Sequence, residues 1–361
     1  MRATPPGEGR EQPGRDPSTG RGARPAPPWR AAPAVGTTQW LGPLDVTSGS
    51  VSVRHVIALD VGGTAMKAAL TGLDGTPLYE ERRGTGRERG PEAVVESVLR
   101  FAEDLGVLGR ERLGTAAEAV GLAVPGIVDA GRGVAVHAVN LGWREVPLGA
   151  LLGRRLGGVP VALGHDVRTG GLAEGRLGAG RGTGRFLFVS LGTGIAGAIG
   201  IGDRIEAGAH GCAGEIGHIV VRPGGPACGC GGRGCLETLA SADAVGRAWA
   251  VASGDPSADA ADCAGAVAAG DEAASRVWRA AVAALADGLV TAVTVLDPRA
   301  LVLGGGLAEA GDTLLAPLRA AVAERVTFQR LPAIVPAALG DTAGCLGAGL
   351  LARDLLARAA V

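Results

Sequence analysis

The chain has 361 residues, which is enough for two domains of ordinary size. Its formal net charge of −1 gives no electrostatic reason to expect a nucleic-acid partner. No run of about 18 apolar residues occurs, so no membrane-spanning helix is expected, and the N-terminus lacks the apolar stretch of a signal peptide. We therefore expect a cytoplasmic protein with no membrane partner.

Residues 1–53 are rich in Pro, Gly, Arg and Ser and show almost no apolar periodicity. Such a segment cannot bury enough apolar surface to offset the entropy of ordering it. We expect a disordered tail, or residues that precede the true start of translation. No amphipathic helical pattern occurs in it.

The pattern changes at His55, where a short apolar run predicts a buried strand over residues 55–59. The turn Asp60-Val-Gly-Gly-Thr64 follows, and a second strand resumes over residues 65–70 with Lys67 inside it. Glycines in such a turn let backbone N–H groups approach a phosphate without Cβ atoms in the way. An ordinary Gly-Gly hairpin turn fits the same residues equally well.

The next elements are a helix over residues 91–105, a strand over 119–124 and a strand over 159–163. Asn140 lies just before Trp143 in an irregular segment, where it either contacts a polar ligand or simply forms a turn. Asp166 follows the last of these strands and begins a helix that runs to residue 177. There it is either a helix N-cap or a general base at the end of a strand.

A second strand, Gly-Thr turn and strand occupies residues 186–201, with Gly192-Thr-Gly194 as the turn. It repeats the pattern of residues 55–70, which suggests a duplicated architecture with one phosphate loop in each domain. Further along we expect helices at 241–253 and 271–296 with a small-residue loop between them, then a strand at 299–303. Gly304-Gly-Gly306 follows, either admitting a nucleoside or allowing tight packing, before helices at 312–325 and 341–358.

Three of the six cysteines gather in the glycine-rich stretch between Cys228 and Cys235, ten residues after His218. Cys228, Cys230 and Cys235 form the pattern C-x-C-x4-C. Three thiolates and one imidazole make a closed tetrahedral set that suits a structural Zn²⁺ ion. A disulfide is the weaker alternative, because nothing marks the chain as secreted. Cys263 has no nearby partner and is expected to be inert.

This stretch resembles the signature of the ROK family of sugar kinases and regulators, which reads A-G-E-x-G-H and then C-x-C-G-x-x-G-C-x-E. The chain has A-G-E-I-G-H from Ala213 and C-G-C-G-G-R-G-C-L-E from Cys228. The turn after Asp60 resembles the family's first phosphate motif, D-x-G-G-T-x-x-K. Family kinases usually carry E-N-D where this chain has Gly164-His165-Asp166, so the base is retained and its two neighbours differ.

The resemblance covers residues 54–358 and implies an α/β, actin-like (RNase H-like) two-domain ATPase fold with a ligand cleft between the domains. The implied boundaries are an N-terminal domain at 54–165, a C-terminal domain at 166–340 and a final helix at 341–361 that packs back on the first domain. ATP, Mg²⁺ and a structural Zn²⁺ are the implied cofactors. A homodimer or homotetramer is the implied assembly.

The resemblance also assigns residues. Asp166 would be the catalytic base. The implied sugar-binding residues are Asn140, His165, Asp166, Glu215, His218 and Glu237. The implied nucleotide-binding residues are Asp60, Gly62, Gly63, Thr64, Lys67, Gly192, Thr193, Gly194, Gly304, Gly305 and Gly306. The implied metal ligands are His218, Cys228, Cys230 and Cys235.

The function implied is ATP-dependent phosphorylation of a hexose at its 6-hydroxyl, with glucose as the first candidate. Kinases for N-acetylmannosamine, N-acetylglucosamine or fructose share most of these residues, and polyphosphate is an alternative donor. A sugar-sensing protein without kinase activity is the alternative of another class. The retained Asp166 and both phosphate turns argue against it, as does the missing helix-turn-helix pattern.

Overall fold

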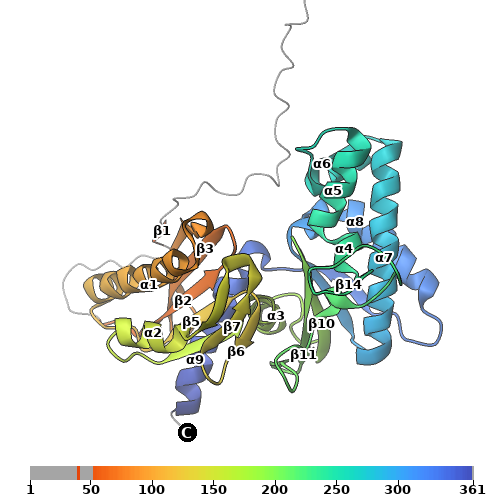
Figure 1. Cartoon of the computed structure of the whole chain (residues 1–361). Helices are drawn as coiled ribbons and strands as arrows, with labels where there is room; N and C mark the ends of the chain where they lie inside the picture. Colours follow the sequence, from red (N-terminus) through yellow and green to blue (C-terminus); the bar gives the residue numbers. More distant parts are fainter. Residues whose placement is uncertain (1–38, 41–51, 360–361) are drawn as a thin grey trace, which may run out of the picture. The chain divides into compact units, whose positions relative to one another are not determined.

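The computed structural model describes residues 39–40 and 52–359. The described part contains two large β-sheets and one small one, with helices packed on their faces (Figure 1). This mixed arrangement confirms the predicted α/β class. The six-stranded sheet has the order β1 (Gln39–Trp40), β4 (Pro77–Gly84), β3 (Ala65–Gly72), β2 (His55–Val61), β5 (Val120–Val124) and β9 (Val161–His165).

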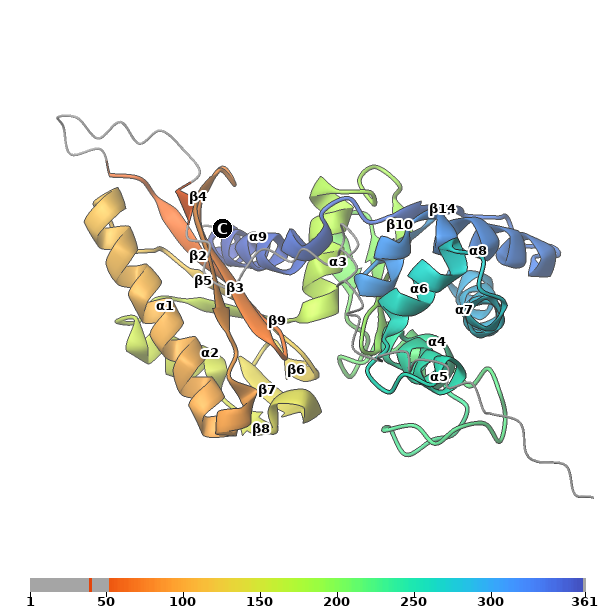
Figure 2. The same cartoon turned by 90° about the horizontal axis from the view of Figure 1, so that it is seen from above.

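The first sheet is covered on both faces, as Figure 2 shows: α1 (Pro91–Leu113) lies on one side and α9 (Ala343–Ala359) on the other. Side chains alternate along β2, because successive residues of a strand point to opposite faces. Ile57 and Leu59 join the core beneath α1, whereas Ala58 packs against α9. Large residues therefore fill the α1 face and small ones the α9 face.

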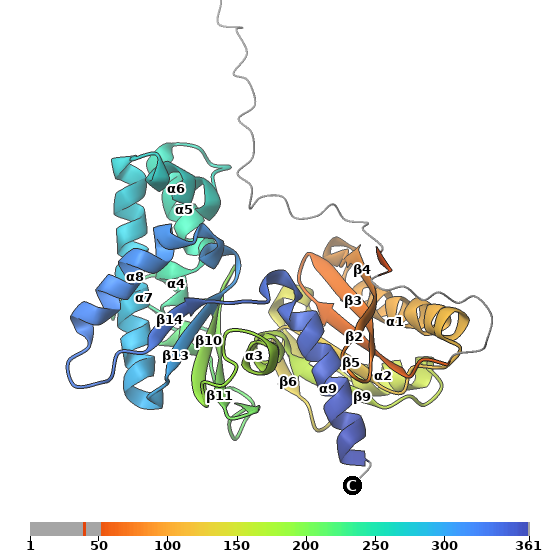
Figure 3. The ribbon, with the colours of Figure 1, turned by 180° about the vertical axis from the view of Figure 1, so that it is seen from behind.

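The small residues on the α9 face allow a close approach of this helix. A Cβ on Gly121 would overlap the carbonyl of Ala348, and a Cβ on Gly347 would overlap the carbonyl of Thr169. Helix α9 therefore packs tightly against β2, β5 and β9 and also against α3 (Asp166–Leu177) (Figure 3). Helices α3 and α9 begin beside two residues of the candidate site: Asp166 is the first residue of α3, and Asp341 lies just before α9.

The second sheet has the order β12 (Arg204–Glu206), β11 (Ile195–Ile201), β10 (Arg185–Leu191), β13 (Ala300–Gly304) and β14 (Ala333–Pro336). Leu187 and Val189 of β10 face a large core, while Phe186 and Phe188 face the side of α3. The helices that contribute to the large core are α4 (Glu237–Ala240), α5 (Ala242–Ser253), α6 (Ala260–Ala268), α7 (Glu272–Leu296) and α8 (Asp312–Arg325).

A small three-stranded sheet joins β6 (Ile127–Asp129), β7 (Val134–Ala138) and β8 (Trp143–Val146), followed by α2 (Leu148–Arg155). Trp143 is almost completely buried and donates its indole N–H to the carbonyl of Pro91 at 3.2 Å. The sequence analysis predicted none of these strands, because each is short and lacks a long apolar run.

Helix α7 is long and apolar enough to span a membrane by length and composition alone. Half of its most apolar window is nevertheless buried inside the protein, and residues such as Trp278, Leu285 and Leu289 belong to the core of the second sheet. In this fold α7 is a core helix. The hydropathy that qualifies it reflects packing against α5, α6 and α8.

Several predicted bounds were wrong. Helix α1 continues to Leu113 instead of ending at 105, and the segment predicted as a small-residue loop contains α6, which begins with a capping box formed by Asp259 and Asp262. Strand β9 runs two residues further than expected, to His165.

Within the segment predicted to be a tail, Gln39–Trp40 pair antiparallel with Glu80 and Tyr79 of β4. Val53 also donates its backbone N–H to the carbonyl of Leu113 at 2.9 Å. Residues 1–38 and 41–51 lie outside the described residues.

Candidate functional site

The first glycine-threonine turn joins β2 to β3 and is fixed by its neighbours. Within it, the N–H of Gly62 donates to the carbonyl of Ala65 at 2.9 Å. The buried Thr85, just after β4, donates its hydroxyl to the carbonyl of Gly62 at 2.7 Å and its N–H to the carbonyl of Thr64 at 3.0 Å. These bonds hold the turn in a defined shape and engage one of its N–H groups, that of Gly62, so the N–H groups of Gly63 and Thr64 are left for a ligand.

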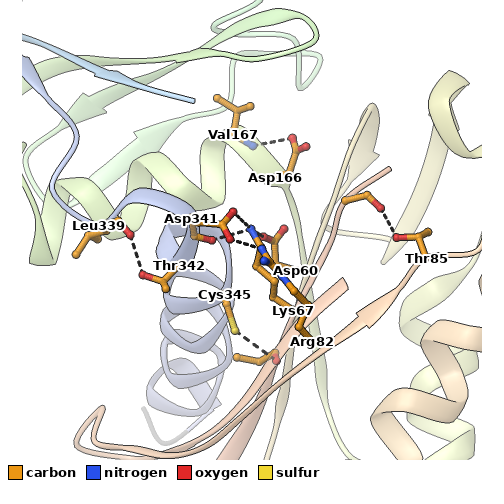
Figure 4. Close-up of polar contacts among 12 residues, drawn as sticks. Asp60, Lys67, Arg82, Thr85, Asp166, Val167, Leu339, Asp341, Thr342 and Cys345 are labelled. Carbon is orange, nitrogen blue, oxygen red and sulfur yellow. Dashed lines mark hydrogen bonds and ion pairs between the residues drawn. The ribbon is translucent and has the colours of Figure 1, made fainter. Parts of the chain in front are cut away.

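Charged side chains lie beside this turn. Asp60 ends 3.8 Å from the ammonium of Lys67, measured from Oδ2 to Nζ. Burial raises the pKa of Asp60, and Lys67 opposes that shift. Lys67 and Arg82 both form ion pairs with Asp341, which lies just before α9 (Figure 4). The sequence analysis named Asp60 and Lys67 but missed Arg82 and Asp341.

Asp166 is the first residue of α3 and directly follows the last residue of β9. Its Oδ1 accepts a hydrogen bond from the N–H of Val167 at 2.6 Å (Figure 4). Burial first, and then the charge of Asp60, raise the pKa of Asp166 to about 7. A carboxylate with a pKa in this range can accept a proton from a hydroxyl group at neutral pH.

His165, and not Asp166, is the N-cap of α3. Its Nδ1 accepts the N–H of Arg168 at 3.4 Å, which assigns the ring proton to Nε2. That Nε2 lies 3.4 Å from Oδ1 of Asp166. Burial lowers the pKa of His165 to about 4, so the ring is neutral at pH 7. With the capping role taken by His165, the carboxylate of Asp166 is available for other chemistry.

The second glycine-threonine turn joins β10 to β11 and lies against Glu237. The N–H of Gly192 donates to the carbonyl of Gly194 at 3.0 Å. Oε2 of Glu237 accepts the N–H of Ile195 at 2.9 Å, and a Cβ on Gly194 would overlap this oxygen. One oxygen of this predicted sugar-binding residue is therefore already engaged in holding the turn.

The glycine turn after β13 is adjacent to the second turn, because Ser190 of β10 pairs with Gly304. Gly305 has a φ of 85°, and a Cβ at this position would overlap the backbone of Leu191. Only glycine fits such a backbone at such a distance. The structure thus brings together Gly192–Gly194 and Gly304–Gly306, two of the segments predicted to bind nucleotide.

The three predicted cysteines and His218 form one cluster. Their donor atoms all lie within 4.8 Å of one another, with Cys230 Sγ and Cys235 Sγ 3.8 Å apart. Nδ1 of His218 lies 3.6 Å from Sγ of Cys228. A tetrahedral zinc site with Zn–S bonds of about 2.3 Å has S–S edges of about 3.8 Å, so the cluster has the dimensions of a zinc site. The other nitrogen of His218 remains available.

The remaining predicted sugar-binding residues are less well placed by the contacts of the chain. Glu215 is exposed, and its charge contributes to the raised pKa of Asp166. Asn140 is exposed in the short helical turn Val139–Leu141. Among the described residues, Asn140 has no hydrogen bond that ties it to the other predicted sugar-binding residues.

A cavity of about 910 Å³ lies beside α3 and is lined by His165 and Arg168 together with parts of β6, β9, β12 and α9. Its lining includes neither Asp166 nor Glu215 nor His218. His165 is thus the one predicted sugar-binding residue that faces this cavity, and the cavity does not identify the sugar site.

Sequence reasoning also missed Glu174, a fully buried residue in α3. Its carboxylate accepts the N–H groups of Ala179 at 2.8 Å, Leu339 at 2.8 Å and Ala338 at 3.2 Å. It therefore ties the end of α3 to the segment that leads into α9. No signal in the sequence indicates this role, because two of the three partners are backbone groups about 165 residues away.

Known proteins resemble this chain over most of its length. The model of the ROK family matches residues 56–355. The glucokinase of Halalkalibacterium halodurans is 32% identical over 84% of this chain and 96% of its own length. A crystal structure of a ROK family glucokinase from Streptomyces griseus with glucose and AMPPNP has a TM-score of 0.71 and 30% identity, covering 83% of this chain and 99% of that one. The xylose repressor of Bacillus subtilis is 25% identical over 83% of this chain and 77% of the repressor.

The family match spans most of the chain, and the structural likeness extends through both large sheets. These findings confirm the α/β, actin-like ATPase fold that the motifs predicted. The chain belongs to the ROK family.

Proposed function

We propose that the protein is an ATP-dependent hexose kinase that phosphorylates the 6-hydroxyl, with glucose as its first candidate substrate. The observation that carries the proposal is Asp166, a carboxylate at a strand end beside the first phosphate turn, with a pKa raised to about 7. Glucokinase relatives over most of the chain support a sugar kinase that uses ATP and Mg²⁺. The choice of hexose rests on the residues alone.

The nucleotide would lie along the three glycine turns. The turns Gly62–Thr64 and Gly192–Gly194 would hold the phosphates with those backbone N–H groups that do not donate within the turns, and Gly304–Gly306 would face the nucleoside. Asp60 would hold Mg²⁺, which neutralises charge on the β- and γ-phosphates when it is bound. Asp60 lies close enough to Asp166 for its charge to raise the pKa of Asp166, and its carboxylate oxygens are the ligands that this cation prefers.

The sugar would lie between Asp166 and the metal cluster. Asn140, His165, Glu215, Glu237 and the free nitrogen of His218 would bind its hydroxyl groups. Asp166 would take the proton of the 6-hydroxyl while that oxygen attacks the γ-phosphorus in line, and ADP would leave with the electron pair of the broken P–O bond. Positioning of the two reactants supplies much of the rate in such reactions.

His218, Cys228, Cys230 and Cys235 would hold a structural Zn²⁺ ion, which their donor distances fit. When bound, the ion would brace the loop that precedes α4 and so fix Glu237 against the second turn. Thiolate ligands of this kind need a reducing compartment, which supports a cytoplasmic location. The domain boundaries at 54–165, 166–340 and 341–361 and the homodimer or homotetramer stay predictions.

The test is an ADP-release assay over a panel of sugars: glucose, mannose, fructose, allose, N-acetylglucosamine and N-acetylmannosamine. The same panel is repeated with polyphosphate in place of ATP, and there the sugar phosphate is measured because this donor releases no ADP. Sugar-dependent ADP release with glucose supports the proposal. Tight sugar binding by calorimetry without turnover of any donor would instead identify a sugar-sensing protein, an alternative that the similarity to a xylose repressor keeps open.

A further inference from the structure

Three charged residues form a row across neighbouring strands at the end of the first sheet. Asp60 of β2 pairs with Lys67 of β3, and Lys67 pairs with Arg82 of β4. Residues that lie opposite one another in adjacent strands point to the same face of the sheet. Lys67, three residues after the first phosphate turn, and Arg82 are thus side by side on one face.

One exposed carboxylate binds both cations. Oδ1 of Asp341 contacts Nζ of Lys67, and Oδ2 contacts Nη2 of Arg82 (Figure 4). The backbone carbonyl of Asp341 also accepts from Lys67 at 2.7 Å. The side chain of Asp341 is 60% exposed, whereas those of Lys67 and Arg82 are 23% and 16% exposed. The carboxylate therefore lies over the cations on their solvent side.

The carboxylate of Asp341 offsets the repulsion between the positive charges of Lys67 and Arg82. Two adjacent cations repel each other, and Asp60 lies 3.8 Å from Lys67, beyond hydrogen-bond distance. Within the described residues, Arg82 has no other carboxylate within ion-pair distance. Although burial acts to raise it, Lys67 and Arg82 hold the pKa of Asp341 below its usual value. Asp341 is therefore ionised at neutral pH.

We propose that Lys67 and Arg82 bind the terminal phosphoryl group of the nucleotide, and that the carboxylate of Asp341 occupies their site until the nucleotide displaces it. This proposal rests on the proposed function and adds Arg82 and Asp341 to its site. A phosphoryl group carries more charge than a carboxylate and offers three acceptor oxygens, so it competes well for an ammonium and a guanidinium fork.

Two roles are possible for Asp341, and they predict opposite changes in nucleotide affinity when Asp341 is replaced. If Asp341 only positioned the two cations for nucleotide, its loss would weaken binding. If it occupies the phosphoryl site, its loss strengthens binding of nucleotides that have the terminal phosphoryl group and leaves AMP unaffected. Direct binding therefore separates the two roles in a way that turnover alone does not.

The experiment measures AMPPNP and AMP binding by calorimetry with Mg²⁺ for the full chain and for D341N, R82Q and D287N. For AMPPNP we expect about fivefold tighter binding by D341N and about fivefold weaker binding by R82Q, with AMP unchanged in both. D287N removes the exposed ion pair of Asp287 with Arg325, between α7 and α8, and serves as the matched control with unchanged binding.

Equal or weaker AMPPNP binding by D341N overturns the proposal, and so does a R82Q variant that binds AMPPNP as the full chain does. Circular dichroism of each variant verifies folding, and D341A repeats the test without the amide of asparagine. If the unaltered chain binds neither nucleotide, the proposed kinase function fails as well. If it binds AMPPNP but D341N does not bind more tightly, only the displacement of Asp341 fails.

Discussion

The two glycine-threonine turns have the same backbone design but different surroundings. The first turn lies beside two cations and two carboxylates, and Thr85 fixes its carbonyl groups. The second turn, Gly192–Gly194, has Glu237 against it and the glycine turn of β13 alongside. A repeated strand-turn-strand unit therefore carries charge at one copy and close backbone packing at the other.

The different surroundings of the two turns indicate which part of a nucleotide each turn would bind. Under the proposed function, the turn with Lys67, Arg82 and Asp60 would receive the phosphoryl group whose charge changes during transfer. At the second turn, the glycines of Gly304–Gly306 leave the backbone accessible, so a nucleoside and its first phosphates would bind there. Variants that affect one turn should change different kinetic parameters from variants that affect the other.

The largest expected effect is at Asp166, whose pKa depends on Asp60 beside the first turn. In Asp166→Asn the kcat for hexose phosphorylation should fall by about 10²- to 10⁴-fold, because the amide cannot accept the hydroxyl proton. Sugar binding should persist, since the amide keeps the size and hydrogen-bonding oxygen of the carboxylate. Steady-state kinetics and calorimetry measure the two quantities.

Thermal unfolding at about pH 8 is the control for this variant. A folded-state pKa of about 7 means that the folded protein holds a proton that the unfolded chain releases near pH 4, so this group lowers stability as the pH rises through that range. Asp166→Asn removes the unfavourable charge and should not lower the Tm. A near-normal kcat would exclude Asp166 as the base.

Loss of Cys230, a proposed metal ligand, should affect the second turn. In Cys230→Ser the bound zinc should be lost, and kcat/KM should fall by about 10- to 100-fold because Glu237 no longer has a fixed position against Ile195. Elemental analysis and kinetics test this result. Cys212→Ser, at an exposed cysteine outside the cluster, is the matched control. Zinc-free wild-type protein with full activity would contradict it.

The pH dependence of kcat/KM should reflect the ionisation of Asp166 beside the first turn. Because Asp166 has to be ionised to accept a proton, kcat/KM should fall about tenfold for each pH unit below about 7. The sign follows from the raised pKa: protonation begins near neutral pH and removes the base. A profile that stays flat down to about pH 5 would show that Asp166 has an ordinary pKa or is not the base.

Much of this arrangement could be predicted from short-range sequence patterns. Both strand-turn-strand units stand out because apolar runs flank Gly-Thr dipeptides, and the cysteine spacing predicts a cluster that the structure brings within metal-binding distance. The end of β9 was missed, because Gly164 and His165 lack apolar side chains. Parallel pairing of His165 with Val124 extends the strand to the residue before Asp166.

Long-range partners could not be predicted in this way. Arg82 and Asp341 are 259 residues apart, and nothing near either residue indicates the other. Their contact depends on the packing of α9 against the first sheet, which the small residues Gly121 and Ala58 permit. Glu174 was missed for the same reason, because its partners are backbone groups that tertiary packing brings to it.

The smallest expected effect tests the shape of the first turn alone. Thr85→Val keeps the volume of the side chain but removes the hydroxyl that donates to the carbonyl of Gly62. A half-buried carbonyl left without this donor should cost about 1 kcal/mol in the free energy of unfolding and raise the KM for ATP a fewfold. Chemical denaturation and kinetics measure both. Thr291→Val removes a comparable hydroxyl bond to the carbonyl of Asp287 on the exposed side of α7 and should leave the KM unchanged. An equal effect of the two substitutions on KM would mean that the bond at Gly62 stabilises the fold without shaping the phosphate turn.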